Sequence, residues 1–272
     1  MTNHLRATFK KEGTVVDADG RHPFLLADPN TVWMVSKRKV DLFYNGVKDG
    51  ETASPRTYLQ TIDEGELIFG IGMGSEDFGL VAVGVVGAEL IKFDYQRLRE
   101  LTVEPDCQDE AILQIERWIT KMYEGLGHTR AIPKAAEKSL DVNTTIELEQ
   151  DQIAIDIKST SVCWTKLTKG ASMFEGIVEI DLEPSDIYLP IIRGQWISAL
   201  QDSSIQTLDI RSLIRNQEDG TALRFSIVSF LIGQRSSMIE RRNTKRSVFK
   251  IAPRLTKVLR VMLSRFLHLY LI

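Results

Sequence analysis

The first hundred residues alternate short apolar runs with turn residues. Residues 31–36 and 39–44 mix β-branched and aromatic side chains, and Asn45-Gly46 and Asp49-Gly50 then supply residues that tolerate a positive φ. Similar runs follow at residues 57–62, 66–71, 79–85 and 88–93. Short strands at this close spacing predict a β-sandwich, roll or barrel.

The hydrophobic period then changes from strand to helix. Asp94 is a suitable N-cap for a short helix over residues 95–101, and Pro105-Asp106 begins a longer helix that ends near Gly125 and Gly127. Its apolar residues recur at helical spacing: Ala111, Ile112, Ile115, Trp118, Ile119, Met122 and Leu126. Such a stripe is typical of a helix that faces a core, and we predict a helical connector.

The strand pattern returns at about residue 143. Its runs span residues 153–157, 162–167, 174–180, 186–192 and 205–210. A second β lobe is therefore predicted after the connector, without a residue-level repeat of the first. Beyond Gly220 the pattern is helical, and the two large aromatics Trp33 and Trp164 are each expected in the core of one lobe.

Charge is distributed unevenly. Residues 220–272 hold eleven Lys and Arg but one acid, Glu240, a local net charge of +10, and the preceding 219 residues have a net charge of −13. This asymmetry predicts an acidic body with a basic tail. The tail has few aromatics for base stacking and no recognition motif, so nucleic acid is not an expected partner.

The chain shows no signal for export or for membrane insertion. Its N-terminus lacks an apolar segment, and residues 258–272, the most apolar stretch, are short and interrupted by Arg260 and Arg265. Cys107 and Cys163 follow no metal-ligand spacing, which indicates a reduced chain. These features predict a cytoplasmic protein.

Sequence motifs for catalysis are missing. The chain has no Gly-Lys dipeptide and no Gly-x-Ser-x-Gly, which excludes a Walker-type loop and a nucleophile elbow. Gly70, Gly72 and Gly74 have the wrong spacing for a dinucleotide site, and we interpret them as bends or bulges. The four histidines are isolated and give no metal site. We predict a non-enzyme that holds no cofactor.

Acidic residues gather around one predicted turn. Glu64, Glu66, Glu76 and Asp77 lie close together in the sequence. They are compatible with a catalytic carboxylate pair, but a solvated loop is the simpler interpretation, and it is the one that we favour.

Residues 32–98 resemble the cyclic-nucleotide-binding β-roll. The likeness rests on the run from Val32 to Phe43, on Ile62-Asp-Glu-Gly-Glu-Leu-Ile-Phe-Gly70 and on the start of a closing helix at Tyr95. Two features of that family are missing: an acid for the ribose after Phe69-Gly70, and an arginine for the phosphate. A buried phosphate without a cation is very unfavourable, so we expect that cyclic-nucleotide binding is lost. Arg38 or Lys39 in place of the usual glycine suggests a different hairpin.

The sequence DPNTVWMVSKRKVDLFYNGVKDGETASPRTYLQTIDEGELIFGIG is also similar to the N-terminal region of ABC transporters that export bacteriocins with nitrile-hydratase-type leader peptides. The likeness continues weakly around residues 189–196 and 238–246. It implies a non-catalytic cytosolic module at the inner face of the membrane, separate from the transmembrane and ATPase parts. Exporter subunits or a leader peptide are the implied partners. The alternative is a stand-alone sensor of a small ligand.

The implied fold is mainly β with helices (α+β). Two cyclic-nucleotide-binding or cupin-like β-rolls are joined by a helical connector and followed by a helical basic tail. The expected segments are residues 1–104 for the first roll, 105–142 for the connector, 143–218 for the second roll and 219–272 for the tail. The candidate contacts with a ligand or partner are Gly65, Glu66, Phe69, Gly70 and Gly72.

The end of the tail is predicted to be an amphipathic helix. Arg254, Lys257 and Arg265 share one flank of it, and Arg260 lies nearer the apolar face. Such a helix can lie on an anionic membrane or pack against a partner. Two other interpretations stay open, in which the helix packs on the acidic body or frays without its natural partner.

Overall fold

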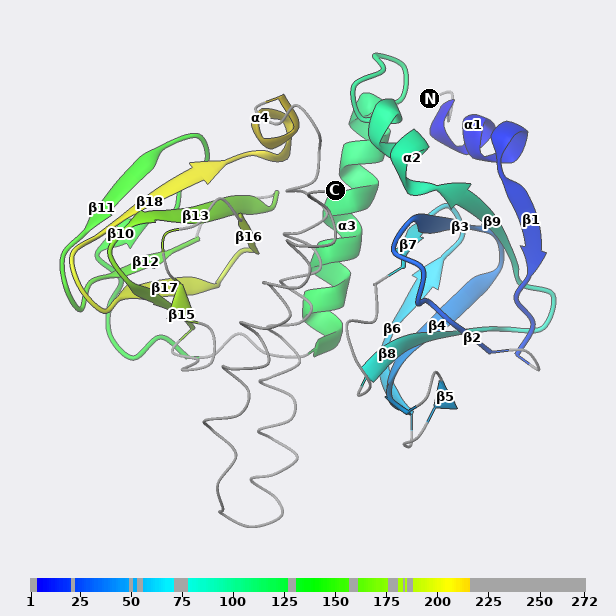
Figure 1. The fold of residues 1–272 in the computed structure, drawn as a ribbon, viewed down its shortest axis with the longest axis horizontal. Helices are drawn as coiled ribbons and strands as arrows, with labels where there is room; N and C mark the ends of the chain where they lie inside the picture. Colours follow the sequence, from blue (N-terminus) through cyan, green and yellow to red (C-terminus); the bar gives the residue numbers. More distant parts are fainter. Residues whose placement is uncertain are drawn as a thin grey trace, which may run out of the picture.

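A computed structural model describes residues 4–20, 23–48, 51–52, 56–70, 78–126, 131–156, 161–175, 181–182, 184 and 188–215. Antiparallel strands dominate it and a few helices accompany them, so the predicted α+β class is confirmed (Figure 1). Gly72 and the tail residues Arg254, Lys257, Arg260 and Arg265 lie outside the described residues.

The first roll follows a short helix and is closed by another. Its elements are α1 (His4–Glu12), β1 (Thr14–Asp17), β2 (Phe24–Leu25), β3 (Thr31–Lys37), β4 (Lys39–Lys48), β5 (Glu51–Thr52), β6 (Thr57–Asp63), β7 (Leu67–Phe69), β8 (Phe78–Gly84), β9 (Glu89–Asp94) and α2 (Tyr95–Leu101). One sheet has the order β1-β9-β3-β7; the other has the order β2-β8-β4-β5, with β6 also paired to β4.

The second roll follows the long helix α3 (Gln108–Leu126). Its elements are β10 (Lys138–Ser139), β11 (Thr145–Leu148), β12 (Ile153–Ile155), β13 (Cys163–Lys169), β14 (Ser172–Phe174), β15 (Asp181–Leu182), β16 (Leu189–Ile191), β17 (Trp196–Ala199), β18 (Ser203–Leu208) and α4 (Ile210–Arg215). The sheets have the orders β11-β18-β13-β16 and β10-β12-β17-β14-β15.

The two rolls have the same topology. If β5 and β10 are set aside, each roll places its first, eighth, third and sixth strands in one sheet and its second, seventh, fourth and fifth in the other. This arrangement is a jelly roll, in which two sheets face each other across a core. The duplication is one of architecture, since the sequence shows no repeat.

Helix α3 lies between the two rolls (Figure 1). Buried residues of both rolls and of α3 form one continuous hydrophobic cluster. A smaller cluster of Ile153, Ile155 and Trp196 lies apart from it. Trp33 and Trp164 are both buried, one in each roll, as predicted.

Predicted helix boundaries hold with small shifts. Asp94 caps α2 by accepting a hydrogen bond from the Arg97 amide at 3.0 Å, which confirms the predicted N-cap. Helix α3 begins later than predicted and continues through Gly125. A Cβ at Gly125 would lie 2.3 Å from the Leu59 carbonyl oxygen, so this glycine permits close packing on β6 and does not end the helix.

The local structure differs from the prediction at several places. Helices α1 and α4 were not predicted, because α1 buries only Leu5 and Phe9 and α4 is a short helix of six residues. The strand predicted over 174–180 is wrong at its start, since β14 ends at Phe174 and Glu175 has φ +48°. The hairpin expected at Arg38 is a crossing between sheets, and Arg38 takes the left-handed conformation, φ +65°.

None of the helices in the described part of the chain combines the length and apolarity that a membrane span requires.

Candidate functional site

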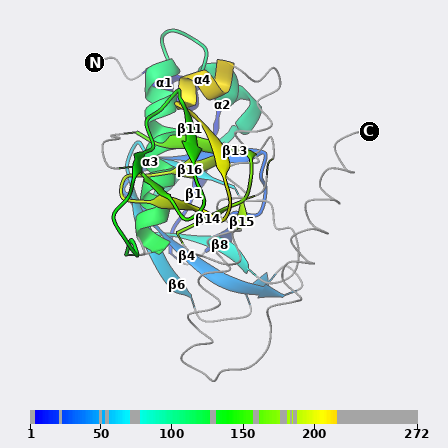
Figure 2. The ribbon, with the colours of Figure 1, turned by 90° about the vertical axis from the view of Figure 1, so that its left-hand side faces the viewer.

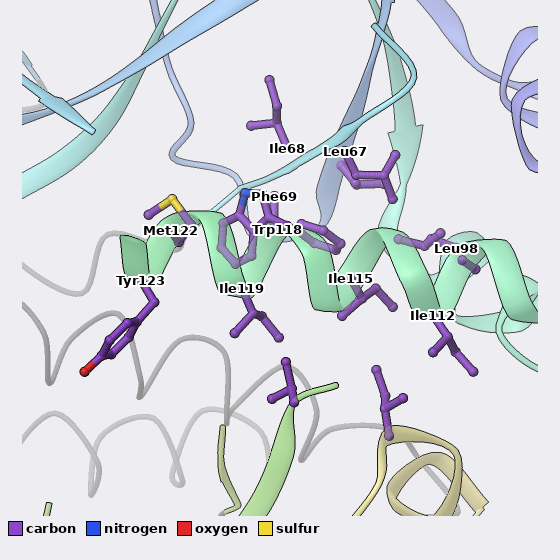
Figure 3. Packing of buried hydrophobic residues seen from close by; sticks show 14 of the residues in the cluster. Leu67, Ile68, Phe69, Leu98, Ile112, Ile115, Trp118, Ile119, Met122 and Tyr123 are labelled. Atoms are coloured by element: carbon purple, nitrogen blue, oxygen red, sulfur yellow. The ribbon is translucent and has the colours of Figure 1, made fainter. Parts of the chain in front are cut away.

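The best-defined candidate site is the surface of α3, which contacts a different roll on each side. Trp118 and Met122 face the first roll, whereas Ile112, Ile119 and Tyr123 point to the second (Figure 3). All five are buried. Positions three or four apart share a helix face, so α3 has two adjacent apolar stripes, one for each roll.

Phe69, one of the predicted candidates, packs on α3. Its ring centroid lies 4.9 Å from that of Trp118 and 6.4 Å from that of Tyr95. Tilted and edge-on ring pairs at such distances are favourable beyond the area that they bury. The end of β7 is thereby held against both α3 and α2.

Glu66 forms an ion pair with α3. Lys121 Nζ donates to Glu66 Oε2 at 2.6 Å and also lies 3.6 Å from an Asp63 carboxylate oxygen, and the Asp63 amide donates to Glu66 at 2.9 Å. Glu66 is only 9% exposed, so the expectation of a solvated loop is wrong for this residue. The ion pair joins residues 55 positions apart, which no local pattern reveals.

The glycines at this turn have backbone roles. Gly65 adopts φ +87°, and its amide donates to the Val35 carbonyl at 2.8 Å. At Gly70 a Cβ would lie 1.8 Å from the Asp28 carbonyl oxygen, so only glycine fits. The structure therefore places four candidates, Gly65, Glu66, Phe69 and Gly70, in one segment, where Glu66 and Phe69 face α3.

Glu64, also in this acidic segment, points to another partner. It forms an exposed ion pair with Arg6 of α1. A hydrogen bond from Arg6, with the charge of that guanidinium, lowers the pKa of the Glu64 carboxyl. Glu64 and Glu66 therefore belong to separate ion pairs, and Glu76 and Asp77 lie outside the described residues.

The second roll is joined to α3 by a buried hydrogen bond. Tyr123 Oη donates to Glu175 Oε2 at 2.6 Å, and Glu175 is only 1% exposed. Glu175 follows β14 immediately and adopts a positive φ, which ends the extended conformation of that strand. Sequence reasoning missed both residues, because a single Tyr near a helix end and a single Glu after a strand give no distinctive signal.

Glu116 is a second carboxyl at the contact between α3 and the second roll. It accepts a hydrogen bond from the Val162 backbone, and the charges of Asp209 and Arg211 act on it. Burial raises its pKa to about 7, and the Asp209 charge acts in the same direction. Sequence analysis did not select this residue either.

Metal and thiol chemistry gain no support from the described residues. Over the described ranges no three His, Cys, Asp or Glu side chains gather into a group that could hold a metal ion. Cys107 and Cys163 are both buried and free. Burial raises the pKa of Cys163 to about 12, which keeps it a neutral thiol.

Comparison with known proteins gives distant similarities of structure. No protein-family model and no curated protein sequence matches the chain. The c-di-GMP-responsive regulator CLP of Xanthomonas campestris is similar over 44% of this chain and 61% of its own, with 17% identity and a TM-score of 0.34. The CO-dependent transcription factor CooA of Carboxydothermus hydrogenoformans is similar over 46% and 51%, with 12% identity and a TM-score of 0.31.

A longer stretch is similar to cAMP-bound PfPKA-R. It covers 75% of this chain and 70% of that one, with 11% identity and a TM-score of 0.24. The matched part spans less than two thirds of either CLP or CooA. At such low identities and TM-scores the similarities support no conclusion about ligands. The fold is defined here by the strand order.

Proposed function

We propose that this chain is a non-catalytic regulatory module in which α3 couples two β-rolls. One observation supports this most directly: Lys121 and Tyr123, two positions apart on α3, bond to Glu66 of the first roll and Glu175 of the second. A displacement of α3 against one roll therefore strains a polar contact with the other. The lack of catalytic motifs in the sequence supports a role in binding or regulation.

Coupling through α3 is testable by hydrogen exchange on the full chain. Lys121→Met removes the ion pair with Glu66 of the first roll, and we expect faster amide exchange in β14 and β17 of the second roll as well as in β7. Lys92→Met, at an exposed position of β9, is the matched control and should leave the second roll unchanged. Faster exchange confined to the first roll would overturn the coupling.

The finer proposal places this module in a peptide exporter. It is supported by the sequence resemblance, which also makes a leader peptide and exporter subunits the partners and the cytosolic face of the membrane the location. Fluorescence anisotropy with a labelled leader peptide of the nitrile-hydratase type tests it. Saturable binding is expected, together with no ATP hydrolysis. A peptide that fails to bind at concentrations up to roughly 1 mM, the weak end of specific affinity, would remove this assignment.

A sensor of a small ligand is the second candidate. It is supported by the resemblance of residues 32–98 to the cyclic-nucleotide-binding β-roll and by the two-sheet jelly roll that the first roll forms.

Calorimetry with cAMP and cGMP examines the ligand class of this sensor. We expect no binding, because the segment lacks the acid and the arginine described above and because Glu66 is already paired with Lys121. A low-micromolar dissociation constant for either nucleotide would favour the sensor and contradict the loss of nucleotide binding.

A further inference from the structure

The joint between α3 and the second roll contains an acidic side chain on an otherwise apolar face. Glu116 lies four positions after Ile112 and three before Ile119, and both isoleucines are buried. These spacings place the three side chains on one face of the helix, the face that Figure 3 shows turned to the second roll. A carboxylate there loses much of its hydration.

Three elements meet around this carboxyl. The Val162 backbone, just before β13, hydrogen-bonds to Glu116, and the charges of Arg211 in α4 and of Asp209, immediately before α4, act on it. Helix α4 lies at one end of the second roll, on β13 and β18 (Figure 2). Arg211 is also bonded to α3, since its Nη2 lies 2.5 Å from a carboxylate oxygen of Asp109.

Neighbouring charges offset an ionised Glu116 only in part. The guanidinium of Arg211 is shared with Asp109, and Asp209 is held as an anion by its own hydrogen bonds. Its carboxylate accepts from the Ser212 amide at 2.6 Å and from Asn143 Nδ2 at 2.9 Å. Burial by itself would raise the pKa of Asp209, but these hydrogen bonds outweigh it and the pKa is lowered.

We propose that Glu116 makes the joint between α3 and the second roll respond to protons. The joint is tight when this carboxyl is protonated, because a neutral side chain suits the half-buried, apolar surface. Ionisation loosens it, because the carboxylate gains hydration when α3 separates from β13 and α4. The chain therefore carries a proton-sensitive contact at the helix that joins its two rolls.

The direction of the pH dependence follows from the raised pKa. The ordinary value for a glutamate is 4.5, and burial raises that of Glu116 to about 7. A group whose pKa is higher in the packed state stabilises that state fully below its ordinary pKa and loses this contribution as the pH rises through the higher value. The joint should thus weaken progressively as the pH rises from about 4 to about 8 and change little above that.

Carbon-13 NMR of the full chain, labelled at glutamate carboxyls, measures the titration directly. Protection factors of the amides in α3, β13 and α4, corrected for intrinsic exchange, report the joint over the same range. We expect the Glu116 resonance to titrate near neutrality, and the protection factors to fall as the pH rises toward that midpoint and to level off above it. Titration at the ordinary value of a glutamate would overturn the proposal.

Variants separate this effect from a general change in stability. Glu116→Gln is nearly isosteric and should abolish the fall in protection, whereas Glu124→Gln, on the exposed face of the same helix, should preserve it. Arg211→Gln removes the cation that lowers the pKa, so the midpoint should move to higher pH. A fall that survives in Glu116→Gln, or a midpoint that Arg211→Gln leaves unchanged, contradicts the proposal.

Discussion

The two rolls share a strand order but differ in how they hold α3. The first roll presents an aromatic side chain, Phe69, and a partly exposed ion pair between Glu66 and Lys121. The second presents a fully buried hydrogen bond from Tyr123 to Glu175, with Glu116 nearby. The same topology thus meets one helix through two different chemistries.

This difference shows which constraints the fold imposes. A jelly roll needs alternating apolar positions and turns at suitable intervals, and many sequences meet that need. Polar contacts with α3 need particular atoms at hydrogen-bond distance, so each roll has its own set. Breaking a buried contact also costs more free energy than breaking an exposed one. We therefore expect a larger loss of stability at the contact of α3 with the second roll than at its contact with the first.

The largest expected effect is loss of a core aromatic. Trp164→Ala should lower the free energy of unfolding by about 3–5 kcal/mol, because the side chain is 0% exposed and its removal leaves a cavity. Trp33, 7% exposed, should lie at the lower end of the same range. Urea denaturation measures both. If both losses were below about 1 kcal/mol, neither roll would have the packed core described above.

An intermediate effect is expected at the buried hydrogen bond between α3 and the second roll. Tyr123→Phe removes the donor to Glu175 and should cost about 2 kcal/mol, since a buried carboxylate loses a hydrogen bond. Tyr58→Phe is the matched control: Tyr58 is 54% exposed and its hydroxyl bonds to Thr61, so a change within about 0.5 kcal/mol is expected. Equal losses in the two variants would show that the buried bond adds no stability.

The smallest effect is expected at the ion pair between α3 and the first roll. Lys121→Met should cost about 1 kcal/mol, because water reaches part of the Glu66 ion pair and replaces some of the lost interaction. Lys37→Met breaks a more exposed ion pair with Glu89 and should change stability by at most about 0.5 kcal/mol. If Lys121→Met lost more stability than Tyr123→Phe, the expected ranking of the two contacts of α3 would be reversed.

Part of the candidate site was predictable and part was not. The resemblance to cyclic-nucleotide-binding rolls selected Glu66, Phe69 and Gly70, and the structure places all three in the segment that meets α3 and the Asp28 loop. Their partners Lys121 and Trp118 were not selected as site residues, because the sequence gives them no feature beyond those of ordinary helix positions. Glu116, Tyr123 and Glu175 had no signal at all, since each depends on a partner from another element.

The sequence by itself determined the local structure: short strands with turn residues between them, the cap at Asp94 and the apolar stripe of α3. These features depend on side chains within a few positions of one another, which is the range over which periodicity acts. Only the tertiary structure decided that Arg38 joins two sheets, that Glu66 is buried, and that α3 contacts both rolls. Those outcomes depend on burial by distant segments, and burial changes both the preferred partner of a charge and its pKa.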